Sequence, residues 1–84
     1  MNNEPLDKHS AVTFGANVRR RRLALGLSLE RFAELVGLTP NYLGTVECGR
    51  RDPSLSSIVT IAKGLDIEPG ELFRPIADPS PQAN

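Results

Sequence analysis

The fold is decided by residues 32–46, which read FAELVGLTPNYLGTV. Ala33 is small, so a second helix can cross closely over the helix that carries it, and Gly37 can adopt the positive φ that a tight turn requires. Apolar residues frame the turn on both sides, at Phe32, Val36, Leu38, Leu43 and Val46. This pattern predicts two short helices that are joined at Gly37 and packed against each other. A generic helical hairpin within a small bundle is the simpler alternative.

The spacing of apolar residues predicts five short helices along the chain. They cover about residues 13–25, 28–36, 39–48, 54–65 and 68–73. Inward-facing stripes are expected at Phe14, Val18, Arg22 and Leu25 on the first helix, and at Leu55, Ile58, Val59, Ala62 and Leu65 on the fourth. No segment alternates with a period of two residues over enough length to indicate a strand. The predicted fold class is therefore all-α.

Both ends of the chain differ from this helical segment. Residues 1–12 are largely polar and are predicted to form a flexible arm, and residues 75–84 hold three prolines and are predicted to form a disordered tail. Residues 13–74 are expected to form a single domain, because 84 residues are enough for one domain at most. Such a domain buries only a small core, which leaves little room for an enclosed active site.

The composition argues against several functional classes. His9, the only histidine, lies in the arm, and Cys48, the only cysteine, has no histidine partner, so we expect neither a catalytic pair nor a metal site. No glycine-rich phosphate loop follows a strand, and no enzyme activity, cofactor or small-molecule ligand is expected. The first residues lack the apolar region of a signal peptide, and no apolar run is long enough to span a bilayer. A cytoplasmic protein without a membrane partner is expected.

Charge is distributed unevenly along the chain, although ten basic and ten acidic residues cancel overall. Residues 13–51 hold seven arginines and three glutamates, a net charge of +4, and the rest of the chain has a net charge of −4. A folded domain with this division can present one positive face, as DNA-binding proteins do.

Two charged residues continue otherwise apolar stripes. Arg22 follows Val18 on the first predicted helix, and Glu47 follows Val46 on the third. A lone buried charge is costly, whereas a paired and hydrogen-bonded charge is tolerated. We therefore expect Arg22 and Glu47 to form a structural ion pair that locks the first helix to the third. The alternative is that both side chains tip outward into solvent.

Two stretches resemble the Xre/Cro family, the lambdoid-repressor type of helix-turn-helix domain: VRRRRLALGLSLERFA at residues 18–33 and YLGTVECGRRDPS at residues 42–54. The resemblance covers about residues 14–73. It implies a five-helix, lambda-repressor-like DNA-binding domain whose second and third helices form the helix-turn-helix and whose third helix lies in the major groove. It also implies the Arg22–Glu47 pair.

The end of the predicted domain, residues 54–73, also resembles the controller proteins of restriction-modification systems. This resemblance implies a free-standing dimeric domain that binds operators near its own promoter and times the expression of the endonuclease. Many other free-standing Xre-type regulators share the same ending.

Groove chemistry assigns base contacts to Thr39, Asn41 and Thr45, at the start and outer face of the third predicted helix. Asn41 can make a bidentate contact with adenine, and the two threonines can bond a base edge or pack a methyl group against thymine. Thr39 can alternatively serve only as a helix cap, and Asn41 can instead face water.

Contacts with the DNA backbone are expected from Arg50 and Arg51, just past the third helix, and from Tyr42 on it. Arg19 and Arg20 on the first helix supply a second set. Such contacts set affinity and register rather than sequence preference. The neighbouring Arg21 is expected to face solvent.

Two positions depart from the family pattern. Leu29 stands where a glutamine commonly touches phosphate, a contact that leucine cannot make, and an exposed leucine there can pack on a neighbouring residue or a sugar. Cys48 stands where arginine or asparagine is common. A thiol near the DNA backbone and Arg50 raises the hypothesis of a redox switch. A small, half-buried residue without such a role is the alternative.

A single short domain touches few bases, so we expect a homodimer whose recognition helices lie about 34 Å apart on a palindromic operator. The candidate interface comprises Ile67, Leu72, Phe73 and Ile76, part of which must cap the monomer core. The alternative is a monomer with a self-sufficient fifth helix.

The expected function is that of a transcriptional regulator bound to double-stranded DNA of the nucleoid, such as a repressor or an autoregulatory controller of a restriction-modification system. An antitoxin or adaptor that uses the same fold to bind a protein partner is the alternative function.

Overall fold

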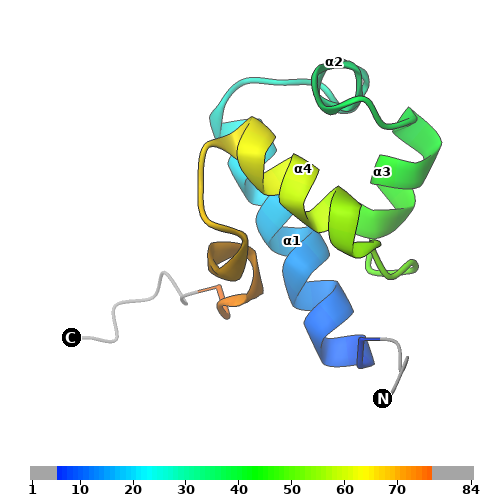
Figure 1. The fold of residues 1–84 in the computed structure, drawn as a ribbon, viewed down its shortest axis with the longest axis vertical. Coiled ribbons are helices and arrows are strands. Elements are labelled where there is room, and N and C mark those ends of the chain that lie inside the picture. The colour runs from blue at the N-terminus through cyan, green and yellow to red at the C-terminus, as the bar shows by residue number, and fades with distance from the viewer. Residues whose placement is uncertain (1–5, 77–84) are drawn as a thin grey trace.

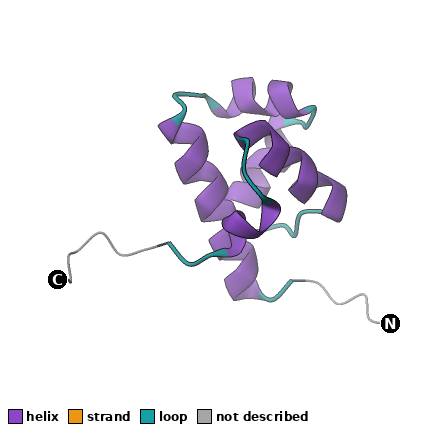
Figure 2. Cartoon of the chain, turned by 60° about the vertical axis from the view of Figure 1, so that its left-hand side comes forward, coloured by secondary structure: helices purple, strands orange, loops and turns teal. Residues whose placement is uncertain are grey.

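The computed structural model describes residues 6–76, which form four α-helices and one 3-10 helix (Figure 1). The elements in chain order are α1 (Lys8–Ala24), α2 (Leu29–Val36), α3 (Pro40–Glu47), α4 (Leu55–Leu65) and η1 (Pro69–Phe73). Residues 6–76 contain no strand, in agreement with the predicted all-α class (Figure 2). Residues 1–5 and 77–84, which include most of the predicted tail, lie outside the described residues.

The fifth helical segment is a 3-10 helix of five residues rather than an α-helix. Pro69 and Gly70 open it, and both residue types have low α-helix propensity. Five residues also allow too few i to i+4 hydrogen bonds for a stable α-helix, so the chain takes the tighter i to i+3 pattern.

Each α-helix begins at a side-chain cap. The side chains of Asp7, Ser28, Thr39 and Ser54 each accept a hydrogen bond from a backbone N–H in the first turn that follows. The bounds of α2, α3 and α4 therefore lie within one or two residues of the prediction, whereas α1 begins at Lys8 instead of near residue 13. The described part of the predicted arm is thus mostly helix, because Asp7 supplies a cap that the search for apolar spacing does not detect.

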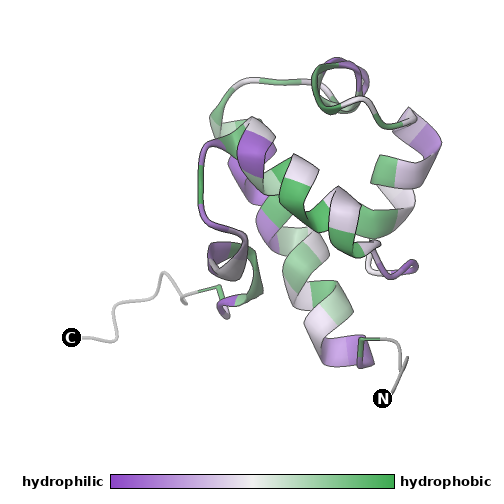
Figure 3. Cartoon of the chain, in the orientation of Figure 1, coloured by the Kyte–Doolittle hydropathy of each residue, from purple (hydrophilic) through white to green (hydrophobic). Residues whose placement is uncertain are grey.

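The α-helices and η1 enclose a core of aliphatic and phenylalanine side chains. The buried apolar residues at its centre are Phe14, Val18, Phe32, Ala33, Val36, Leu43, Val46, Ile61, Ala62, Leu65 and Leu72. Apolar and polar positions accordingly mix along every α-helix (Figure 3). Leu25, which was expected to continue the inward stripe of α1, is 57% exposed because the helix has ended one residue before it.

The inward face of α4 differs from the prediction. Val59 and Leu55 were expected inside but are 47% and 78% exposed, whereas Ile61 is fully buried. Two apolar stripes run along this helix, and periodicity alone does not choose between them. The stripe with Ile58, Ile61, Ala62 and Leu65 faces the core that the other helices build.

A close crossing of α1 and α3 fixes the position of α3. Gly15 lies on α1 where a Cβ atom would collide with the carbonyl oxygen of Val46 and would lie 2.7 Å from that of Glu47. The absence of a side chain at Gly15 therefore lets the two helices approach backbone to backbone. A glycine inside a helix is unfavourable by itself, so this contact accounts for its presence.

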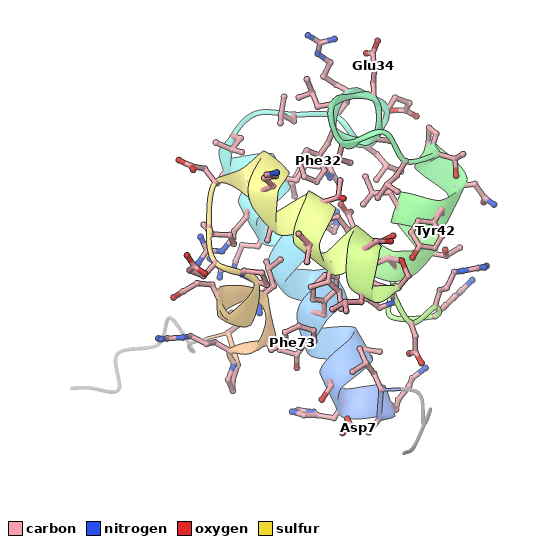
Figure 4. All side chains as sticks on the ribbon, viewed as in Figure 1. Asp7, Phe32, Glu34, Tyr42 and Phe73 are labelled. Atoms are coloured by element: carbon pink, nitrogen blue, oxygen red, sulfur yellow. The ribbon has the colours of Figure 1, made fainter. Side chains whose placement is uncertain are left out.

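The C-terminal part of the domain is tied to α1 by a buried amide. Asn17 is only 1% exposed. Its side-chain Nδ2 donates hydrogen bonds to the carbonyl oxygens of Leu72 at 3.0 Å and Arg74 at 2.7 Å. Phe73 packs its ring against Phe14 with 4.9 Å between centroids, and Figure 4 shows Phe73 beside α1. These contacts close the domain between its first helix and its last described turn.

Candidate nucleic-acid interface

The short turn between α2 and α3 is centred on Gly37. Gly37 has a φ of 72° in the left-handed region, and the N–H of Leu38 donates to the carbonyl oxygen of Ala33 at 2.9 Å. Ala33 is fully buried against the neighbouring elements. Only Thr39 then separates Leu38 from the first residue of α3, so the turn fixes the start of α3 relative to α2.

The first turn of α3 carries two of the three predicted base-contacting residues. Thr39 is the N-cap, and its Oγ1 accepts a hydrogen bond from the N–H of Tyr42 at 3.1 Å. Asn41 lies exposed in the first turn. The third residue, Thr45, is half-buried one turn later, and its hydroxyl donates to the carbonyl oxygen of Tyr42 at 2.8 Å. Thr39 therefore has the capping role that the sequence left open, while Asn41 has its side chain at the surface.

A shallow hollow brings several of these residues together. This "α3 hollow", about 400 Å³ in volume, is lined by Leu29, Pro40, Asn41, Gly44, Thr45, Cys48 and Arg50. Two predicted base-contacting residues and one predicted phosphate-binding arginine therefore share a single surface depression. Cys48 lies exposed in the same hollow, at the C-cap of α3.

Tyr42 links α3 to the start of α4. Its phenolic oxygen accepts a hydrogen bond from the N–H of Ser54 at 3.1 Å, and the Arg51 guanidinium lies 5.2 Å from the centre of its ring. Figure 4 shows Tyr42 between the two helices. Burial raises the pKa of the phenol, but hydrogen bonds with Ser57 and Ser54 and the Arg51 charge outweigh burial and hold the pKa below its usual value.

The remaining arginines lie in different surroundings. Arg19, Arg20, Arg50 and Arg51 are exposed. Arg20 donates to the side-chain oxygen of Asn17 at 3.1 Å, which places it near the C-terminal segment, whereas Arg50 lines the α3 hollow. Arg21 was expected to face solvent, but it is partly buried and its Nη2 lies 3.7 Å from Glu71 Oε1.

A buried ion pair holds α3 on α1. Arg22 Nε lies 2.8 Å from Glu47 Oε2 and Nη2 lies 2.9 Å from Oε1, and both side chains are less than 10% exposed. A third donor, Arg22 Nη1, reaches the carbonyl oxygen of Leu27 at 2.8 Å, in the loop that leads to α2. The hydrogen bonds with Glu47 raise the pKa of Arg22. One side chain thus connects α1, α3 and the entry to α2.

The residues predicted for a dimer interface divide between the core and the surface. Leu72 is fully buried, so it belongs to the part of this set that caps the monomer core. Ile67 and Phe73 are half-buried, and Ile76 is 42% exposed.

Sequence reasoning missed two structural residues, Gly15, which lets α3 approach α1, and Asn17, which holds the C-terminal segment on α1. A glycine and an asparagine inside a predicted helix were the available signals, because both residue types are uncommon there without a packing or hydrogen-bonding reason.

Within residues 6–76, no group of three or more His, Cys, Asp or Glu side chains could hold a metal ion. None of the helices in this part of the chain has the length and apolar character needed to cross a bilayer.

Comparison with known proteins identifies the fold family. The model of the HTH_3 family, described as helix-turn-helix, matches residues 18–72, most of the chain. The chain belongs to the HTH_3 family. The match contains α2, the Gly37 turn, α3 and the Arg22–Glu47 pair.

Several known proteins are similar to this chain in sequence or in fold. The control protein C.SmaI of Serratia marcescens is 42% identical over 50 residues, which cover 60% of this chain and 60% of C.SmaI. The control protein C.MunI of a Mycoplasma species is 35% identical over 66 residues, covering 77% of this chain and 89% of C.MunI. The chain thus spans less than two thirds of the length of C.SmaI but most of C.MunI.

Among solved structures, the restriction-modification controller protein C.AhdI from Aeromonas hydrophila superimposes with a TM-score of 0.72 at 51% sequence identity. The match covers 75% of this chain and 96% of C.AhdI. Two sequence relatives and one solved structure similar to this chain are thus control or controller proteins.

Proposed function

We propose that this chain is a sequence-specific DNA-binding transcriptional regulator of the Xre/Cro type. In this proposal α2, the Gly37 turn and α3 form the helix-turn-helix, and η1 takes the place of the fifth helix of a lambda-repressor-like domain. The observation that carries the proposal is the α3 hollow, in which Asn41, Thr45 and Arg50 line one depression on an exposed helix. Side chains of this kind on an outward-facing helix suit the major groove.

Asn41 and Thr45 are the proposed base-contacting residues, with Thr39 as the cap that presents them. Arg50, Arg51 and Tyr42 are the proposed phosphate contacts, and the hydrogen bond between Tyr42 and Ser54 holds the tyrosine beside the start of α4. Arg19 and Arg20 add exposed positive charge on α1, although the hydrogen bond to Asn17 draws Arg20 toward the C-terminal segment. The ion pair of Arg22 and Glu47 supports this arrangement, because it keeps α3 rigid against α1.

The regulator acts as a homodimer on a palindromic operator in this proposal. Ile67, Phe73 and Ile76 remain the proposed interface residues, since all three retain exposed surface next to η1. Replacing Ile76 with glutamate is expected to yield a monomer by sedimentation, with Leu23→Glu as a control at a similarly exposed apolar residue on α1. A dimer that persists in Ile76→Glu would move the interface elsewhere.

The proposed circuit is autoregulation within a restriction-modification system. The similarity to C.SmaI, C.MunI and C.AhdI supports this circuit, because these proteins are described as control or controller proteins. A restriction endonuclease encoded by a neighbouring gene is the expected genetic context.

The experiment that tests the proposal is a titration of the protein into a labelled duplex from upstream of its own gene, at near-physiological salt. A scrambled duplex of equal length is the control. Tight and cooperative binding to the native duplex alone would support the regulator. Equal, weak binding to both duplexes that salt abolishes would favour the alternative of an antitoxin or adaptor that binds a protein partner.

A further inference from the structure

The floor of the α3 hollow is apolar because two residues from different helices meet there. Leu29, the first residue of α2, is half-buried beside Gly44 on α3. A Cβ atom at Gly44 would lie 3.4 Å from Leu29 Cδ2, so the absence of a side chain at Gly44 leaves the leucine methyl group uncovered toward α3. Pro40 and Cys48 extend this apolar lining.

Polar groups lie at the edges of the same hollow. Asn41 can both donate and accept hydrogen bonds, and Arg50 carries a positive charge. Thr45 already donates its hydroxyl proton to the carbonyl oxygen of Tyr42, so it offers an acceptor and a methyl group to a ligand. An apolar floor flanked by an amide and a cation suits a ligand with an apolar group, a polar edge and a nearby negative charge.

We propose that the Leu29–Gly44 floor of the α3 hollow binds the C5 methyl group of a thymine in the operator, which makes Leu29 and Gly44 specificity-determining residues. This inference rests on the proposed DNA-binding function. The thymine methyl is the apolar group that a base pair displays in the major groove, and the adjoining phosphate lies within the reach of a cation such as Arg50. The hollow therefore fits the chemistry of one thymine nucleotide.

The same floor disfavours cytosine at that position. Cytosine presents an N4 amino donor to the major groove and has no methyl group. The floor would then face the C5–H of cytosine, so Leu29 would lose the apolar contact that the C5 methyl group of thymine supplies. The floor thus selects thymine over cytosine through its contact with the C5 methyl group.

Replacing thymine with uracil tests this proposal, since the exchange removes the methyl group and changes nothing else in the groove. The probe is the duplex that the full-length protein enriches from a random pool, with uracil placed at one thymine position at a time. The wild-type protein is expected to bind about fourfold more weakly when the contacted thymine is replaced, the effect of one buried methyl group. Leu29→Ala is expected to bind the thymine and uracil duplexes equally.

Two further variants complete the experiment. Gly44→Ala introduces a better helix former, but its methyl group covers Leu29 Cδ2, so the variant is expected to lose most of the preference for thymine. Leu35→Ala is the matched control, because Leu35 is an exposed leucine of α2 that does not line the hollow, and it should keep the full fourfold preference.

The outcomes separate this inference from the proposed function. An enriched duplex on which no uracil exchange changes the dissociation constant by twofold would refute the methyl contact and leave DNA binding intact. A preference for thymine that survives in Leu29→Ala would also refute it. A fall in dimer mass of Leu29→Ala without DNA would show that the hollow holds a second copy of the chain instead. A pool from which nothing is enriched would overturn the proposed function and this inference together.

Discussion

Arg22 and Glu47 form a bidentate pair in which Nε and Nη2 of the arginine lie 2.8 and 2.9 Å from the two carboxylate oxygens. The pair joins α1 to α3 inside the domain, where neither side chain has more than 10% exposure. The pair should therefore contribute to the stability of the folded domain.

Removing one partner of this pair should be strongly destabilising. Arg22→Met leaves the Glu47 carboxylate buried without its cation, and we expect the free energy of unfolding to fall by about 3 kcal/mol or more. The double variant Arg22→Met/Glu47→Leu should recover much of this loss, because no buried charge remains. Urea denaturation measures the free energy of unfolding of both variants. Equal losses in the single and double variants would contradict the interpretation that the unpaired buried charge causes most of the destabilisation.

Gly15→Ala should disrupt the crossing of α1 and α3. The added methyl group meets backbone carbonyls that cannot rotate away, so the helices must separate, at a cost of about 2 kcal/mol or more. Gly70→Ala is the matched control, since a Cβ atom there meets nothing within 4 Å. The measurement is the thermal midpoint of each variant. Similar midpoints for the two variants would show that the close approach is not needed.

Asn17→Asp should weaken the attachment of the C-terminal segment. The carboxylate keeps the shape of the amide but has no hydrogen to donate to the carbonyl oxygens of Leu72 and Arg74. We expect a loss of about 1–3 kcal/mol in unfolding free energy. Hydrogen exchange of η1 amides in wild type and variant would locate the effect, and unchanged exchange of these amides would argue against this role of Asn17.

The salt dependence of DNA binding should identify the phosphate contacts. Arg50→Ala and Arg51→Ala are each expected to weaken binding to all duplexes and to reduce the slope of log K against log salt by about 1. Asn41→Ala should instead relax sequence preference, by about 1–3 kcal/mol at one base pair, and leave the slope unchanged. Lys63→Ala, an exposed lysine near the end of α4, is the control for loss of any positive charge. A slope that falls equally in Lys63→Ala would mean that the effect is non-specific.

The first turn of α1 should depend on pH through Asp7. Hydrogen bonds from Ser10 hold the pKa of this carboxyl below its usual value. The cap is therefore present at neutral pH, and its contribution is lost as the pH falls below about 4 and through the lowered pKa. NMR exchange of amides 10–12 between pH 5 and pH 2 measures the loss. Asp7→Asn keeps a capping oxygen without a titrating group and should lack this transition.

Sequence patterns predicted the elements that depend on local signals. Ser28, Thr39 and Ser54 precede their helices as caps, and Gly37 follows α2, so these positions could be read from residue type alone. The contact between Arg22 and Glu47 followed from two charges on apolar stripes, because burial leaves such charges few alternatives to pairing.

Features that depend on the approach of distant segments were missed. Gly15 is required by the path of α3, and Asn17 is held by residues more than fifty positions away, so neither role is visible in the surrounding sequence. The choice between two apolar stripes on α4 is likewise made by the core that the other helices build, which is why Ile61 rather than Val59 faces inward.

The Asn17 bonds have a consequence for how the protein is made. They join α1 to residues 72 and 74, which leave the ribosome 55 and 57 residues after Asn17. The ring of Phe14 likewise lacks its packing partner until Phe73 has been added to the chain. A growing chain therefore cannot complete this domain by adding finished pieces in order, because the contacts of Asn17 form only after residue 74 has been translated.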